Sequence, residues 1–585
     1  MTVANGAIRG SGDIPGPSPS LWWIEQAFER ARASGKPEDD TRLRVFFILA
    51  LFVAGFLALS LDATKAALFS GLGAGADSAL LAPNARAELV DRNGQILATD
   101  LVHYGLYLNQ DEISDVPATR AALLAALPGL EPARLDKALG GDHKQYYLVG
   151  GLPPDAKARI HDLALPGVMF QEETARAYPL GSTGAHVIGF AGKDGSGLAG
   201  AERAFNTQVH GDAGRAPVQL SIDLRVQGAL QDELETAATH FQVLDATGMV
   251  VNIRTGEILA LASYPAFDPN RPGAADPASM IDHAAATVYE PGSVFKVFTL
   301  AMGLDSGVAT VDTMFDVHTP LVLPGQIIHD YDKGDRMLPL WEVFTHSSNI
   351  GAARMALLAG ADRMDHYWHA FGLYNAAPSE LVESARPLVP KKLSQNAVAS
   401  MAFGHSISIS PLMIATGMGA ILNGGIYRPL TLKKLESGQA PAPGRRIIQA
   451  STSRTMLNLM RLNATNGTGR KANVPGYRVG GKTGTATKLK NGHYNGAKIN
   501  LASFAAVFPT DGPLDQDRYF VLIMMDEPHA TPETGGFTTG GVVSAPIAGK
   551  VIDRIAPFLG VRRIVLPGDG APVAEVDPKL LTGDE

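Results

Sequence analysis

A serine and a lysine three residues apart open an apolar segment in the middle of the chain. Ser293 and Lys296 follow a Pro-Gly break, and the segment continues to Gly307. Residues three apart on a helix share a face, so a helix here would bring the Ser293 hydroxyl within hydrogen-bond distance of the Lys296 amine. An uncharged amine can accept the hydroxyl proton and make the serine a nucleophile. Taken alone, the pair is more typical of an N-cap serine followed by a solvated lysine.

Two later segments favour the catalytic interpretation. Ser347-Ser348-Asn349 follows Ser293 after about fifty residues, and Lys482-Thr483-Gly484-Thr485 follows it after about 190 residues. Three such segments in this order are a signature shared by penicillin-binding proteins and class A β-lactamases. The pattern therefore predicts a serine enzyme that transfers an acyl group.

The composition limits the classes of function that need to be considered. At 585 residues the chain is too long for one ordinary core, so more than one domain is expected. The net charge of −8 and the lack of a basic block argue against a nucleic-acid partner. Cysteine is absent, which excludes disulfides, thiolate nucleophiles and metal sites with cysteine ligands.

Residues 45–61 carry no charged side chain and are mostly apolar. This pattern predicts a single transmembrane helix at the short end of spanning length. The segment begins too far along the chain for a cleaved signal peptide, so we expect a retained anchor. Arg42 and Arg44 precede it, and the positive-inside tendency then places residues 1–44 in the cytoplasm and the chain after the anchor outside. Residues 62–83 are expected to form a flexible linker.

Residues 84–218 are predicted to form a non-catalytic module, a pedestal of mixed secondary structure. An Asn93-Gly94 turn joins two short strands within 87–98, which is a strong hairpin signal. Helical patterns follow at 119–127, 133–139 and 154–163, and a glycine-rich polar segment then indicates many turns. His186 in this segment is expected to be a packing histidine rather than a ligand.

Residues 219–566 are predicted to form a second domain. Its expected elements are a helix at 224–240, a hairpin about a Thr255-Gly256 turn, strands at 499–508 and 519–525, and a last helix at 541–559. Early strands, a helical middle and late strands imply one antiparallel sheet that joins the first and last strands and is flanked by helices. The expected fold class is therefore α+β. After this domain, residues 567–585 are expected to form a disordered tail.

A polar cluster in the second domain invites a metal interpretation. It contains His318, His329, Asp330, Asp332 and Asp335. The spacing matches no common metal site, so a polar loop is expected instead.

From the anchor to the last helix, the chain resembles the class B penicillin-binding proteins. The three active-site segments carry the resemblance, together with Arg92 and Gly94 and the segment Arg176 to Pro179 in the pedestal. Similarity to the cell-division group, of the penicillin-binding protein 3 type, is carried by Phe403-Gly404-His405, Ser410-Pro411-Leu412, Asn423-Gly424-Gly425 and Asp526-Glu527-Pro528. Two residues depart from the family pattern. Ser406 stands where glycine is usual, and Met413 stands where glutamine is usual.

The resemblance implies a D,D-transpeptidase with a pedestal of the dimerisation type, and it implies roles for five catalytic residues. Ser293 would attack the carbonyl between the two terminal D-alanines of a peptidoglycan stem peptide, with Lys296 as its base. Ser347 would relay a proton to the departing D-alanine. Asn349 would hold Lys296 and the substrate amide, and Lys482 would add positive potential.

Three further residues of the resemblance would bind substrate. Thr483, with Lys482, would bind the terminal carboxylate of the stem peptide. Gly484 would let its strand approach closely, and the N–H groups of Thr485 and Ser293 would form the oxyanion hole. No metal or organic cofactor is expected.

The resemblance also implies partners and a location. The expected partners are stem peptides, β-lactams and a multispanning glycosyltransferase of the division machinery. The protein itself is expected at the bacterial inner membrane, with its catalytic domain in the periplasm. Three alternatives remain: an elongation-specific class B transpeptidase, a D,D-carboxypeptidase or β-lactamase, and a penicillin-sensing receptor. Length and the pedestal argue against the second, and the short cytoplasmic end argues against the third.

Overall fold

The computed structural model describes residues 85–140, 144–210, 216–331, 336–436, 438–488 and 499–566, with a few more residues between 26 and 57 and between 576 and 582. The chain divides into two units, Met1–Leu81 and Ala82–Glu585, and everything below concerns the second. Among the described residues, no helix is long and apolar enough to cross a membrane. About half of the predicted anchor at 45–61, the linker and most of the predicted tail lie outside the described residues. The tail was expected to be disordered throughout, but it contains a short helix, α18 (Lys579–Thr582), which packs against α16 (Ala450–Asn466) and buries Leu581.

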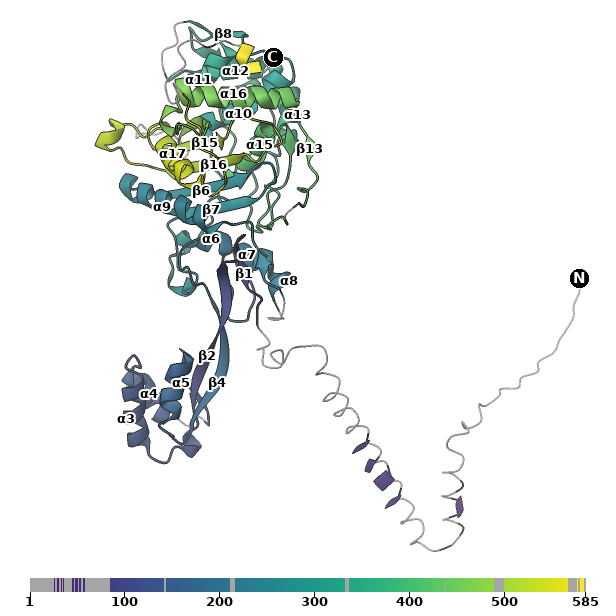
Figure 1. Ribbon diagram of the computed structural model, residues 1–585, viewed down its shortest axis with the longest axis vertical. Coiled ribbons are helices and arrows are strands. Elements are labelled where there is room, and N and C mark those ends of the chain that lie inside the picture. The colour runs from purple at the N-terminus through teal and green to yellow at the C-terminus, as the bar shows by residue number, and fades with distance from the viewer. Residues whose placement is uncertain are drawn as a thin grey trace, which may run out of the picture. The chain divides into compact units, whose positions relative to one another are not determined.

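A long two-stranded ribbon dominates the pedestal. The strands β2 (Ile96–Leu108) and β4 (Val168–Ala177) pair antiparallel over their length, with Thr99 opposite Ala177 at one end and Leu108 opposite Val168 at the other. Figure 1 shows the ribbon running from the catalytic domain to a small group of helices. These are α3 (Val116–Ala126), α4 (Pro132–Gly140) and α5 (Pro154–His161), which pack with β3 (Tyr146–Leu152) around their own core.

The predicted hairpin is confirmed, but its second strand is much longer than expected. β1 (Leu89–Val90) pairs antiparallel with the start of β2, and Gly94 at the turn has a φ of +83°. The extension of β2 was not predicted because its middle is exposed on both faces, so apolar and polar residues do not alternate there. The three predicted helices correspond to α3, α4 and α5.

A buried network of ion pairs stabilises the end of the pedestal that adjoins the catalytic domain. Arg86 and Arg176 both donate to the carboxylate of Glu202, whose side chain is fully buried, and Arg176 also contacts Asp100. Nearby, His186 is buried, its Nε2 lies 2.8 Å from the Ser279 carbonyl, and burial lowers its pKa to about 4. The expected packing role of His186 is confirmed.

The catalytic domain is built on a five-stranded antiparallel sheet in the order β14-β15-β16-β6-β7. Its strands are β6 (Asp245–Asn252), β7 (Ile258–Tyr264), β14 (Gly480–Thr487), β15 (Asn500–Phe508) and β16 (Tyr519–Asp526). β16 pairs with β6, so the prediction that the last strands join the first is confirmed. The chain enters this domain after β5 (Val218–Gln219), which still pairs with β1 of the pedestal.

Helices cover both faces of this sheet (Figure 1). α9 (Leu224–Phe241) and α17 (Ser544–Ile555) bury one face, where Val521 and Ile523 of β16 point. The opposite face, with Phe520 and Leu522, packs against a larger cluster that includes the helices α10 (Lys296–Asp305), α12 (Asn349–Ala359), α15 (Pro411–Leu422) and α16 (Ala450–Asn466). Successive residues of β16 thus point to opposite faces, and both faces of the sheet are buried. The four other strands therefore form a rigid support for the edge strand β14.

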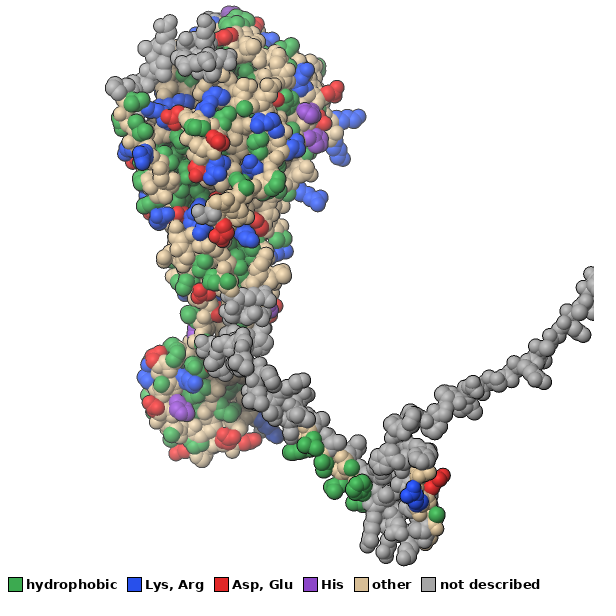
Figure 2. All heavy atoms as spheres, turned by 45° about the vertical axis from the view of Figure 1, so that its right-hand side comes forward, with side chains coloured by type: hydrophobic (Ala, Val, Ile, Leu, Met, Phe, Trp, Pro, Cys, Tyr) green, Lys and Arg blue, Asp and Glu red, His purple; other side chains and the backbone are tan. Residues whose placement is uncertain are grey.

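The visible surface of the catalytic domain carries no large field of one sign. Figure 2 shows acidic and basic side chains interspersed over that face, in keeping with the modest net charge of the chain. Such a surface gives no electrostatic footprint for nucleic acid on the face shown.

Candidate active site

Ser293 lies in a tight turn between a loop and a helix. The turn is a 3-10 helix, η5 (Gly292–Phe295), which leads directly into α10 at Lys296. The sequence predicted a single α-helix here, and the first turn is wound more tightly. Gly292 has a φ of +56°, which a residue with a Cβ adopts only with strain, and its N–H donates to the Gly404 carbonyl at 3.2 Å.

The Lys296 amine is the centre of the site. Its Nζ lies 3.0 Å from the Ser293 Oγ, 3.1 Å from the Ser347 Oγ and 2.8 Å from the Asn349 Oδ1. The lysine is fully buried, and this burial lowers its pKa to about 7, against an opposing effect of Asp330. Near neutral pH a large part of the amine is therefore uncharged and able to accept a proton.

Ser347 stands between two helices in an unusual backbone conformation. It follows α11 (Leu340–Thr345) and precedes α12, and its φ is +60°. The next residue, Ser348, caps α12 by accepting the N–H of Gly351 at 2.9 Å. The left-handed conformation of Ser347 turns the chain sharply, so its hydroxyl and carbonyl both face Lys296.

Lys482 reaches the same hydroxyl from β14. Its Nζ lies 2.8 Å from the Ser347 Oγ and 5.8 Å from the centre of the Phe344 ring. The side chain is fully buried, and burial, followed by the charge of Lys296, lowers its pKa well below the usual value. A hydroxyl between two buried amines can pass a proton from one side to the other.

The remainder of β14 lies against the turn that carries Ser293. A Cβ on Gly484 would stand 2.8 Å from a methyl group of Val294 and 2.9 Å from the Pro291 carbonyl, so only glycine allows this approach. The Thr485 carbonyl is likewise next to Gly292. The strand thus presents its backbone beside the nucleophile, as an oxyanion hole would require.

The structure brings together all eight residues predicted for the site. Hydrogen-bond distances join the five catalytic candidates to one another, through Lys296 and the Ser347 hydroxyl. Thr483, Gly484 and Thr485 follow Lys482 on the same strand.

Two residues near the site were not predicted. Asn463 is fully buried on α16 and donates to the Gly481 carbonyl at 2.7 Å, while its Oδ1 accepts from Thr468. The Thr468 hydroxyl lies 2.7 Å from that of Thr483. No spacing rule signals this contact, because the pair meets only when α16 packs beside β14.

The predicted polar loop also contributes to the site. Asp330 contacts the start of α12, and Asp332 and Asp335 lie outside the described residues. Among the residues that the structure describes, no group of three or more histidines and carboxylates is arranged to hold a metal ion.

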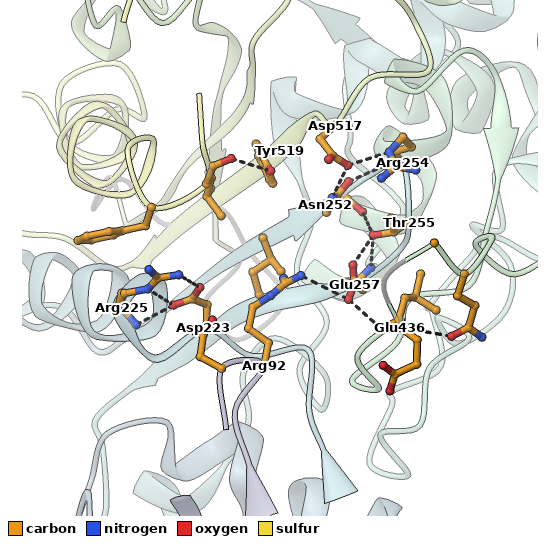
Figure 3. Close-up of a pocket in the computed structure, with 17 residues that line it drawn as sticks. Arg92, Asp223, Arg225, Asn252, Arg254, Thr255, Glu257, Glu436, Asp517 and Tyr519 are labelled. Atoms are coloured by element: carbon orange, nitrogen blue, oxygen red, sulfur yellow. Dashed lines mark hydrogen bonds and ion pairs between the residues drawn. The ribbon is translucent and has the colours of Figure 1, made fainter. Parts of the chain in front are cut away.

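A cavity of about 320 Å³ lies elsewhere, at the junction of the pedestal hairpin and the catalytic domain. Figure 3 shows Arg92, Arg225 and Arg254 along its wall, each beside a carboxylate. The partners are respectively Glu257, Asp223 and Asp517. None of the eight predicted site residues lines this cavity, and its charges are largely neutralised in pairs, so Ser293 and its neighbours remain the candidate active site.

The fold and the site define a serine transpeptidase of the penicillin-binding type. A family model described as the penicillin-binding protein transpeptidase domain matches residues 246–553, and one described as the penicillin-binding protein dimerisation domain matches residues 81–236. The chain belongs to the class B penicillin-binding proteins, in the FtsI group of peptidoglycan D,D-transpeptidases, which are cell-division enzymes and penicillin targets.

Individual relatives agree with this assignment. The chain is 52% identical to the probable peptidoglycan D,D-transpeptidase FtsI of Caulobacter vibrioides, with 93% of each chain covered. It is 29% identical to the peptidoglycan D,D-transpeptidase FtsI of Escherichia coli K12, covering 81% of this chain and 84% of that one. In fold it is similar to penicillin-binding protein 3 of Mycobacterium tuberculosis, solved with aztreonam, at a TM-score of 0.62 and 23% identity over 83% of this chain and 99% of the other.

Proposed function

We propose that this enzyme cross-links stem peptides at the division septum with Ser293 as its nucleophile. The observation that carries the proposal is the 3.0 Å distance between the Ser293 Oγ and the Nζ of Lys296, a fully buried lysine. Such an amine is a competent base near neutral pH, because its charged form has lost its hydration.

The first half of the reaction forms an acyl-enzyme. Lys296 takes the hydroxyl proton as the Ser293 oxygen bonds to the carbonyl carbon of the penultimate D-alanine. The bond from that carbon to the nitrogen of the terminal D-alanine then breaks. The leaving nitrogen takes a proton from the Ser347 hydroxyl, which regains one from Lys296, so the lysine is uncharged again at the end of the step.

The second half transfers the acyl group to an amine. A side-chain amine of a neighbouring stem peptide attacks the Ser293 ester, forms the cross-linking amide and gives up a proton. The serine oxygen leaves and takes a proton back through Lys296. No metal or cofactor enters either half, and a β-lactam acylates the same oxygen when its ring amide opens.

Substrate binding uses β14 and the start of α12. Lys482 and Thr483 hold the terminal carboxylate, and Asn349 holds the substrate amide. The N–H groups of Ser293 and Thr485 stabilise the oxyanion, and each such donor contributes about 3 kcal/mol in comparable enzymes.

The remaining parts of the proposal concern the membrane and the partners. Residues 45–61 anchor the protein in the inner membrane, with 1–44 in the cytoplasm and 62–83 as a linker. The pedestal comprises 84–218 and the transpeptidase domain 219–566, both in the periplasm. A separate multispanning glycosyltransferase supplies the glycan strands, contacted through the anchor and the pedestal. A preparation of this protein alone that polymerises the lipid-linked precursor would overturn this division of labour.

One assay separates transfer from hydrolysis. A synthetic stem peptide ending in D-Ala-D-Ala is incubated with the enzyme and an amine acceptor such as a D-amino acid, and products are resolved by mass spectrometry. Transfer predicts an acceptor-linked product, whereas release of free acid alone indicates a carboxypeptidase. Turnover of a chromogenic cephalosporin at about one per second or faster would indicate a β-lactamase. A fluorescent fusion at midcell, rather than along the side wall, supports the septal role over an elongation role.

A further inference from the structure

The carboxylate of Asp330 holds the turn that contains Ser347 and Asn349. Asp330 follows β10 (Gln326–Ile328), and its Oδ2 accepts the Ser348 hydroxyl at 2.6 Å. Its Oδ1 accepts the backbone N–H groups of Asn349 and Ile350 at 2.5 and 2.9 Å. Three hydrogen bonds to one carboxylate are more than a single capping contact provides.

The residue before Asp330 holds the side chain of Asn349. The carbonyl of His329 accepts the Asn349 Nδ2–H at 3.2 Å. With the amide nitrogen fixed in this way, the Oδ1 of Asn349 is turned toward Lys296, 2.8 Å from its Nζ. The two residues His329 and Asp330 therefore orient both the backbone and the side chain of Asn349.

Asp330 also bears on the strained residue of the site. Ser347 has a φ of +60°, a conformation that is unfavourable for a residue with a Cβ and persists only where neighbours enforce it. The two residues that follow it, Ser348 and Asn349, are the ones that Asp330 binds. Releasing them would let Ser347 relax and move its hydroxyl away from Lys296 and Lys482.

We propose that Asp330 is a positioning residue for acyl transfer, which fixes the turn at Ser347 so that Ser347 and Asn349 meet Lys296. The hydrogen bonds of Asp330 go to Ser348, Asn349 and Ile350, so it acts through this turn. The proposal rests on the function proposed above for Ser293 and Lys296.

The charge of Asp330 provides a readout that a purely structural role would not give. Its negative charge raises the pKa of Lys296, in opposition to burial. Removing the charge should therefore lower the pKa of Lys296. The charge of Lys296 also lowers the pKa values of Lys482 on β14 and of His405, which follows α14 (Gln395–Met401), and neither residue is changed in the variants below.

The test compares Asp330→Asn and Asp330→Ala with the unchanged protein. The second-order rate constant for acylation by benzylpenicillin is measured from pH 5 to 10, together with the melting temperature. We expect the rise of the rate with pH to occur at lower pH in both variants. We expect the rate at the high-pH plateau to fall about tenfold or more in Asp330→Ala, because Ser347 and Asn349 are misplaced.

Asp223→Asn is the matched control. Asp223 also caps a helix, α9, but on the opposite face of the sheet, so its change should lower the melting temperature without moving the pH profile. Profiles of both Asp330 variants that superimpose on the original, with only the melting temperature lowered, would reduce Asp330 to a helix cap and overturn the proposal. If Asp330→Ala is unfolded at the assay temperature, the Asp330→Asn profile decides. Failure of the unchanged protein to acylate would instead contradict the proposed function.

Discussion

Lys296 and Lys482 bring their Nζ atoms to the same hydroxyl oxygen, that of Ser347, at distances of 3.1 and 2.8 Å. Both lysines are fully buried, so the site cannot easily hold two positive charges. The pair therefore loses its first proton well below the pH at which a free lysine would, in two coupled steps. With its pKa lowered to about 7, Lys296 itself is uncharged in a large part of the molecules near neutral pH, beside Ser293.

The acylation rate should rise with pH through about 7, the lowered pKa of Lys296. Below that pH the amine is protonated and cannot accept the Ser293 proton, and above it the rate reaches a plateau. Rate constants for benzylpenicillin at a series of pH values check this, with buffers of constant ionic strength. A rate that does not change between pH 5 and 9 would exclude Lys296 as the base.

Gly484→Ala should reduce acylation by about 100-fold or more, because the added Cβ would press on Val294 and the Pro291 carbonyl and move β14 away from Ser293. Gly228→Ala is the control, since a Cβ at this glycine of α9 meets no atom within 4 Å. It should leave acylation unchanged and stabilise the helix by up to about 1 kcal/mol. Equal acylation rates in the two variants would mean that β14 does not need its close approach.

Ser406→Gly should stabilise the protein. Ser406, which departs from the family pattern, has a φ of +61° and donates its N–H to Glu290 at 2.8 Å. The left-handed conformation costs a serine about 1–2 kcal/mol, which glycine would not pay. Glycine also gives the unfolded chain more freedom, which offsets part of this gain, so the net stabilisation expected is about 0.5–1 kcal/mol. Chemical unfolding measures the difference. Ser451→Gly on the exposed face of α16 should have the opposite sign, and stabilisation by both changes would contradict the argument.

Glu202→Ala should destabilise the pedestal by about 3–5 kcal/mol, because it leaves the buried guanidinium groups of Arg86 and Arg176 without their shared carboxylate. Limited proteolysis of the β2–β4 ribbon and thermal unfolding report the change. Asp136→Ala breaks an ion pair with Arg120 that is exposed to solvent, and should have a much smaller effect. Similar losses in the two variants would show that burial of the network contributes little.

The clustering of the candidate site residues and the central sheet could both be predicted from the sequence, because both depend on local signals. Ser293 and Lys296 are close in the chain, and the late strands are marked by continuous apolar segments such as Tyr519–Asp526. The pairing of β16 with β6 follows from the need of both to be buried on two faces.

The contacts that depend on tertiary packing could not be predicted. Asp330 precedes Ser347 in a loop with no periodicity, and only the folded chain brings its carboxylate to the start of α12. Thr468 meets Thr483 for the same kind of reason, through the packing of α16 beside β14. The long extension of β2 could not be predicted, because the middle of the strand has no buried face and so no alternation of apolar and polar residues.

The central claim is that Ser293 is the acylated nucleophile, and intact-protein mass spectrometry tests it most directly. After incubation with benzylpenicillin, the unchanged protein should gain the mass of one penicilloyl group, and Ser293→Ala should gain none. Lys296→Ala should also stay unmodified while its melting curve shows a folded protein, since the hydroxyl remains but its base is lost. A penicilloyl adduct that persists on folded Ser293→Ala would contradict the account.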